Sequence, residues 1–192
     1  LVAGGGIGEF DATGNDCTFL EITASVLAAS TTAGSIRVNN LSPGTTTIDC
    51  ITDAVCMAPY NVCGLTATGT GGNIILQSVG DVIIHPAVNA ATTPINANNL
   101  VCIESTAGSI LDNNAVSALD INAPNIGLIA NTNVGNPASA FNAPDHFVEL
   151  DANLLAVRSA LLKDVVTKAA NAPGDNRLAQ AEGLQKIVAD TR

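Results

Sequence analysis

The chain has 192 residues and a net charge of −10, and 47% of its residues are hydrophobic although only 3% are aromatic. This length fits one domain with a small appendage, and an acidic surface disfavours nucleic acid and anionic membranes, which bind clustered Lys and Arg. No run of 18 apolar residues is present, so we expect no membrane insertion.

Short strand-like runs follow one another along the first two thirds of the chain. They are four to eight residues long, and Gly, Asn-Asn or Pro-Ala separates them, which indicates turns. Several are apolar at consecutive positions, which is typical of strands buried in parallel sheets. The predicted strands span residues 35–38, 73–79, 81–88, 100–105 and 126–130.

Internal repeats predict how these strands are arranged. The stretch TTAGSIRVNN at 31–40 matches STAGSILDNN at 105–114 in seven of ten positions. Within them, a Gly-x-Ile unit places Ile36, Ile74 and Ile110 at intervals of 38 and 36 residues, close to twice 18 or 19. A fixed period of this size predicts a β-solenoid rather than a β-sandwich. We expect the three Ile side chains to point inward at equivalent positions, and the pairs Asn39-Asn40 and Asn113-Asn114 to lie at equivalent corners.

Three segments resemble a known family. LVAGGGIG at 1–8, LAASTTAGSIRVNN at 27–40 and GTGGNIILQSVGDVII at 69–84 are similar to filamentous-haemagglutinin-type exoproteins of bacterial surfaces. The resemblance covers residues 1–136 and implies a secreted, right-handed parallel β-helix without catalytic residues. Because the chain does not begin with Met, we interpret it as a processed or excised piece of a longer protein.

Five cysteines provide the first candidate sites. Cys50, Cys56 and Cys63 lie close together in the least repetitive part of the chain, whereas Cys17 and Cys102 lie apart. No C-x-x-C motif is present, which argues against zinc and iron–sulfur sites. In an exported protein we expect one disulfide, either Cys50–Cys63 or Cys56–Cys63, rather than a metal site.

Histidines and carboxylates give little indication of catalysis. His85 and His146 are far apart and form no His/Glu pair at helical spacing, so a hydrolytic metal site is not expected. The pairs Asp49 with Asp53 and Asp112 with Asp120 are the candidates for the two carboxylates of a glycoside hydrolase. The first 145 residues hold eleven acids and one base, so calcium is the one ion that we weigh as a ligand; no other cofactor is expected.

The last quarter of the sequence changes character. From about residue 150 the apolar residues recur at a helical period, and Leu154, Leu161 and Val165 lie at the centre of the predicted apolar face. A second helix is predicted from 176 to 190. We therefore divide the chain into a β-solenoid (1–145) and a helical segment (146–192), which either caps the solenoid end or docks on a neighbouring subunit.

These observations predict a non-enzymatic, extracellular structural or adhesive protein. It would be either a segment of a surface exoprotein or a filament subunit that joins head to tail with itself, and cell-surface glycans are the other expected partners. The alternative is a carbohydrate-binding or carbohydrate-active β-helix.

Overall fold

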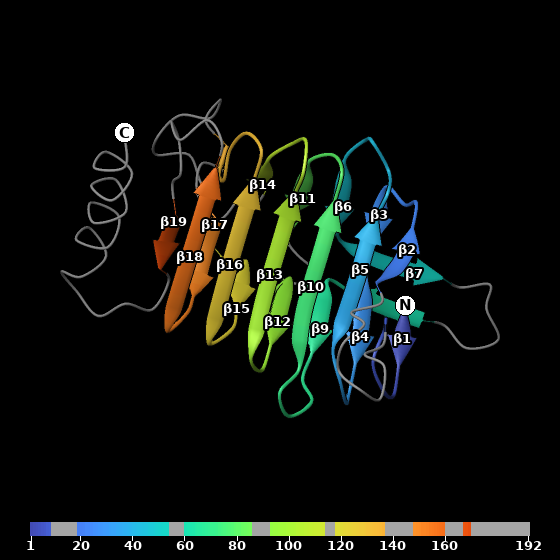
Figure 1. The fold of residues 1–192 in the computed structure, drawn as a ribbon. Coiled ribbons are helices and arrows are strands. Elements are labelled where there is room, and N and C mark those ends of the chain that lie inside the picture. Colours follow the sequence, from blue (N-terminus) through green and yellow to red (C-terminus); the bar gives the residue numbers. More distant parts are fainter. Residues whose placement is uncertain are drawn as a thin grey trace.

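The structure is a computed structural model that describes residues 1–8, 19–53, 60–85, 93–113, 118–136, 148–159 and 167–169. These residues are mainly β, and their strands form three parallel sheets and one antiparallel pair (Figure 1). The predicted mainly β fold with parallel strands is therefore confirmed. Within these ranges no helix is long and apolar enough to cross a membrane.

We number the parallel sheets I to III and give their strands in spatial order. Sheet I contains β1 (Val2–Ala3), β4 (Ala29–Thr31), β9 (Leu65–Ala67), β12 (Ile95–Ala97), β15 (Ile121–Asn122), β17 (Val148–Asp151) and β19 (Thr167–Ala169). Sheet II contains β2 (Leu20–Ile22), β5 (Ile36–Asn40), β10 (Asn73–Ser78), β13 (Leu100–Ser105), β16 (Asn125–Ala130) and β18 (Leu154–Ser159). Sheet III contains β3 (Val26–Leu27), β6 (Thr46–Ile48), β11 (Val82–Ile84) and β14 (Ile110–Asp112). The antiparallel pair is β7 (Cys50–Asp53) with β8 (Tyr60–Cys63).

From β4 to β16 the chain enters sheets I, II and III in turn, and we call one such pass a circuit. Each circuit sets its strands beside those of the circuit before, so the strands of sheet II form a row in sequence order (Figure 1). The shortest circuits run from Leu20 to its register partner Val38 and from Leu150 to Ala169. These two match the predicted period, but inserted loops lengthen the others, most of all the circuit from Ile36 to Ile74.

The matched ten-residue stretches turn out to encode corners rather than whole repeats. The first leads from β4 in sheet I to β5 in sheet II, whereas the second leads from β13 in sheet II to β14 in sheet III. Ile36 and Ile74 are therefore register partners, but Ile110 pairs with Val82 in another sheet. All three Ile side chains are buried, as predicted, while the predicted equivalence is wrong for Ile110. Asn39 and Asn40 belong to β5 in sheet II and Asn113 follows β14 in sheet III, so the predicted equivalence is wrong for Asn113, and Asn114 lies outside the described residues.

In each of the two corners, the hydroxyl of the first residue hydrogen-bonds to the backbone of the glycine three positions further on. The hydroxyl of Thr31 donates to the carbonyl of Gly34 (3.2 Å), and Ser105 Oγ accepts from the backbone N–H of Gly108 (3.1 Å). The serine that follows each of these glycines then reaches the next circuit: Ser35 Oγ accepts from the backbone N–H of Asn73 (3.2 Å). A turn of this kind fits any corner of the stack, so its sequence can recur in different sheets.

Asparagine side chains form a ladder along one corner of the stack. Asn99 Nδ2 donates to Asn73 Oδ1 (2.8 Å), and Asn125 Nδ2 donates to the carbonyl of Asn99 (3.0 Å). The three residues recur every 26 positions where the chain passes from sheet I to sheet II. They link three circuits along one corner, as stacked amide side chains do.

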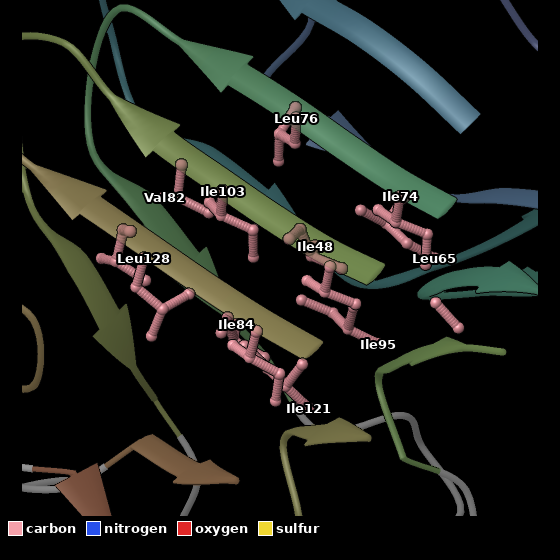
Figure 2. Packing of buried hydrophobic residues seen from close by; sticks show 14 of the residues in the cluster. Ile48, Leu65, Ile74, Leu76, Val82, Ile84, Ile95, Ile103, Ile121 and Leu128 are labelled. Carbon is pink, nitrogen blue, oxygen red and sulfur yellow. The ribbon is translucent and has the colours of Figure 1, made fainter. Parts of the chain in front are cut away.

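Aliphatic side chains fill the space between the three sheets (Figure 2). In sheet II, Leu76, Ile103 and Leu128 stack in register, and all three are buried. In sheet I, Ile95 stacks between Leu65 and Ile121. Small aliphatic side chains suit this core, since each fills one layer of a stack whose strands lie about 4.8 Å apart.

The C-terminal residues that the structure describes contradict the first predicted helix over 150–159, whereas the second predicted helix, 176–190, lies outside the described residues. Residues 148–159 form β17 and β18, and β19 follows at 167–169, so strands continue beyond position 145. Leu154 begins β18, where it is 65% exposed, whereas Leu161 and Val165 lie outside the described residues. The run LLAVRS suits either period, and backbone pairing with β16 selects the strand.

Candidate functional site

The long connections gather where the chain returns from sheet III to sheet I, and we call this side of the stack the loop edge. Residues 49–64, 85–94, 113–120 and 135–147 make these connections. Between β4 and β18, two to five residues close each of the other two corners. Because loops held by a rigid scaffold carry most binding and catalytic residues, the loop edge is the first place to look for a site.

The first connection of the loop edge contains the hairpin β7–β8, which a disulfide closes. Cys50 and Cys63 are register partners and form the disulfide, which confirms one of the two predicted pairings. The Cys56–Cys63 alternative is wrong, since Cys63 is already bonded; Cys56 itself and Cys17 lie outside the described residues. Cys102 is a free thiol in sheet II, and burial, followed by the charge of Glu104, raises its pKa.

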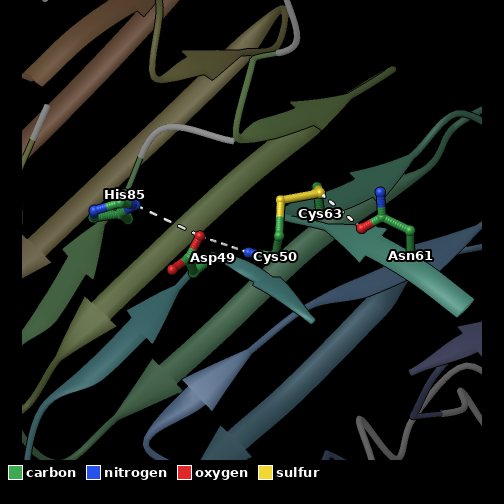
Figure 3. A network of polar contacts seen from close by, with 5 residues as sticks. All are labelled: Asp49, Cys50, Asn61, Cys63 and His85. Atoms are coloured by element: carbon green, nitrogen blue, oxygen red, sulfur yellow. Dashed lines mark hydrogen bonds and ion pairs between the residues drawn. A yellow bond between two sulfur atoms is a disulfide. The ribbon is translucent and has the colours of Figure 1, made fainter. Parts of the chain in front are cut away.

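Asp49 and His85 meet beside this disulfide (Figure 3). Each follows a strand of sheet III, β6 and β11, and the register places the two positions on neighbouring circuits. Asp49 Oδ1 accepts from the backbone N–H of Cys50 (2.7 Å) and lies 3.5 Å from His85 Nδ1. Both side chains are partly exposed, at 30% and 39%, so solvent weakens the ion pair when His85 is protonated.

Three buried carboxylates lie together deeper in the loop edge. Asp112 ends β14, Asp120 precedes β15 and Glu149 belongs to β17, and one oxygen of each lies within 4.8 Å of the other two. Their exposed fractions are 1%, 0% and 2%. The backbone N–H of Glu149 donates to Asp120 Oδ2 (2.9 Å). The sequence singled out Asp112 with Asp120, but not Glu149, which lies far beyond Asp120 along the chain.

Carboxylates packed this closely need a balancing positive charge. Carboxylate oxygens are the donors that hard cations such as calcium prefer. A basic side chain or a shared proton balances such a cluster as well.

Of the predicted site residues, the structure brings together Cys50 with Cys63 and Asp112 with Asp120. It separates Ile110 from Ile36 and Ile74, and Asp49 pairs with His85. His146 lies outside the described residues.

The fold and the loop edge define a mainly β chain of stacked parallel strands that is closed locally by a disulfide. No family model, curated protein or solved structure matches the chain.

We expect replacement of Cys50 and Cys63 together by Ser to lower the free energy of unfolding by about 2–4 kcal/mol, because the open chain regains the freedom that the cross-link removes. Urea denaturation measures the difference, and Cys102→Ser is the matched control. Mass spectrometry of the non-reduced digest should yield one peptide pair that joins Cys50 to Cys63. Free thiols at both positions in exported protein would contradict the assignment.

Proposed function

We propose that the chain is a non-enzymatic segment of an extracellular structural or adhesive protein, in which the three sheets form a right-handed parallel β-helix that serves as a stiff rod. The observation that carries this proposal is the continuous register of sheet II, in which each strand from β5 to β16 pairs on both sides. Backbone pairing along sheets I and II resists bending, and the free strand edges of these two sheets lie at the two ends of the stack. The resemblance to filamentous-haemagglutinin-type exoproteins and the disulfide both support an extracellular location.

The N-terminal end of the stack is where we expect the rod to continue. Its first strands, β1 to β3, carry Val2, Leu20 and Val26 with exposed fractions of 60%, 37% and 41%. Apolar side chains on an edge strand favour the addition of further strands. The added strands would come from a preceding part of a longer chain or from another copy; a head-to-tail contact between copies that does not close produces a filament.

The carbohydrate-active alternative needs carboxylates that a sugar can reach. Asp112 and Asp120 are the closest predicted pair, and both are almost fully buried. Asp49 is partly exposed and lies 3.5 Å from His85, whereas the side chain of Asp53, its predicted partner, lies outside what the structure describes. These contacts favour the structural proposal over catalysis.

Electron microscopy of the purified protein tests the rod directly, and Val26→Lys tests its end. We expect the lysine to abolish filaments or longer rods, because it puts an unpaired charge on the edge strand of sheet III. Leu41→Lys is the matched control. Leu41 is 47% exposed, but it follows β5, which is paired on both sides and is therefore not an edge strand. Round particles in the wild type, or equal effects of the two lysines, would contradict end-to-end assembly.

A further inference from the structure

Sheet II presents a three-by-three array of outward-facing side chains near its C-terminal end, on β13, β16 and β18. The register aligns these strands residue by residue, and the residues between the array positions on β13 and β16 point inward and are buried. The rows of the array, each read from β13 to β18, are Leu100–Asn125–Leu154, Cys102–Gly127–Ala156 and Glu104–Ile129–Arg158.

The third row has opposite charges at its two ends. Glu104 and Arg158 lie on either side of Ile129 and line a hollow of about 190 Å³. They are two strands apart, so their Cα atoms lie about 9.6 Å from each other, and the described residues show no ion pair between them. Glu104 accepts a hydrogen bond from Gln77 Nε2 (2.7 Å), whereas Arg158 is exposed and makes no ion pair among the described residues.

The centre of the second row is Gly127, which the fold itself does not require. Its φ is not in the left-handed region, and an added Cβ would meet only Cys102 Sγ, at an ordinary contact distance of 3.8 Å. Glycine weakens the middle of a strand, and its presence there often marks the close approach of another surface.

The first row contributes the most exposed large apolar side chain of the described residues. Leu154 is 65% exposed at one end of the row, and the partly buried Leu100 occupies the other end. All three rows are therefore complementary to themselves when the strand order is reversed: Leu meets Leu, a small residue meets a small residue, and an acid meets a base.

We propose that this array binds the same array of a second copy of the chain, across a two-fold axis that runs parallel to β16 in the plane of the interface. This axis keeps the strand direction but reverses the strand order. Glu104 of each copy then faces Arg158 of the other, Leu154 faces Leu100, and Gly127 lies next to its own counterpart. An interface of this kind is isologous, with each contact made twice. The two rods lie side by side and point in opposite directions.

Charge favours a second copy as the partner. Each chain carries a net charge of −10, so two copies repel each other over most of their surface. Within the array the charges of Glu104 and Arg158 cancel, which makes it a place where two acidic chains can meet. The contact uses the side of the rod rather than its ends, so the inference goes beyond the proposed function and stands if end-to-end assembly fails.

The native Cys102 provides a direct test through the variant Ala156→Cys. In the pair of rods, position 156 of one copy faces Cys102 of the other across sheets that pack about 10 Å apart, too far for a direct disulfide. A bifunctional maleimide that spans about 10 Å should therefore give a covalent dimer whose digest joins position 156 of one copy to Cys102 of the other. The two positions also lie two strands apart in one chain, but a link between them there leaves the mass of a monomer. The reaction should be run at mildly alkaline pH, because burial raises the pKa of the Cys102 thiol. The control variant Leu41→Cys introduces a thiol of similar exposure outside the array, and adding Cys102→Ser to Ala156→Cys should remove the cross-link.

Charge reversal tests the interface without a thiol. Sedimentation velocity of the wild type should show a concentration-dependent dimer, and Glu104→Arg or Arg158→Glu alone should weaken it roughly tenfold. The double variant restores opposite charges across the axis and should recover the dimer. Glu21→Arg is the matched control, because Glu21 lies in the same outward row of sheet II, on β2.

Val26→Lys should leave this dimer intact, which separates it from assembly at the ends. The proposal is overturned if the wild type stays monomeric and Ala156→Cys cross-links no more than Leu41→Cys. It is also overturned if the double charge variant dimerises as weakly as the single charge variants. A glycan that binds the monomer and protects the thiol of Ala156→Cys from reaction would likewise overturn it.

Discussion

Gly64→Ala is expected to lower the free energy of unfolding by about 2–6 kcal/mol, the largest effect among the single substitutions considered. Gly64 joins the disulfide hairpin to β9, and its φ of 66° is a conformation that residues with a side chain rarely adopt. An added Cβ would lie 1.9 Å from the carbonyl oxygen of Pro94, which accepts the backbone hydrogen bond of Leu65. The new methyl group must therefore break the contact between two circuits.

Two other glycines separate the causes of this effect. Gly71 has a φ of 71° and open space around its Cβ position, so Gly71→Ala measures backbone strain alone. Gly80 has no left-handed φ, but an added Cβ would lie 2.1 Å from the carbonyl oxygen of Gly44, so Gly80→Ala measures crowding alone. In urea denaturation, the free energy of unfolding of Gly64→Ala should be lower than that of Gly71→Ala and lower than that of Gly80→Ala. Equal stability of the Gly64 and Gly71 variants would show that circuits are not packed as closely as the structure has them.

The second large effect is expected in the core. Ile74→Ala should cost about 2–5 kcal/mol of unfolding free energy, because it leaves a cavity that neighbouring strands cannot fill. Ile74 is fully buried and lies in register between Ile36 and Val101. The same denaturation measurement applied to Ile75→Ala, on the opposite face of β10, should give a loss of about 1 kcal/mol. If the two variants were equally stable, the assignment of the inward face of sheet II would be wrong.

The sequence predicted the class of strand pairing because local patterns determine it. Short apolar runs between turn residues indicate buried parallel strands wherever they occur, and β10, β13 and β16 are such runs. The repeated stretches led to a wrong prediction of which sheet each strand joins, since a Thr-Ala-Gly-Ser turn specifies a corner without specifying which two sheets the corner connects. Which sheet Ile110 enters depends on the number of residues inserted between corners, and a repeat interval does not reveal that number.

The difference between local and distant sequence information also explains which residues of the loop edge were predicted and which were not. Cys50 and Cys63 are near neighbours in sequence, so their pairing could be proposed from spacing alone. Glu149 joins Asp112 and Asp120 only because residues 135–147 connect one circuit to the next, and this distance in sequence carries no periodic signal. At Leu154 the sequence favoured a helix, because the apolar pattern of 154–159 fits both periods and only a neighbouring strand distinguishes them.

The loop edge is the side of the stack at which the chain can accept inserted residues. The circuit that carries the hairpin, from Ile36 to Ile74, is about twice as long as the one from Leu20 to Val38, yet both keep sheet II in register. New sequence can therefore enter at this edge without disturbing the stacked core, whereas an insertion within a strand would shift every side chain after it. Neighbouring circuits are about 4.8 Å apart, so peptides grafted into successive connections would be displayed in a dense row. This spacing makes the stack of parallel strands a natural scaffold for diversifying a recognition surface, whether by evolution or by design.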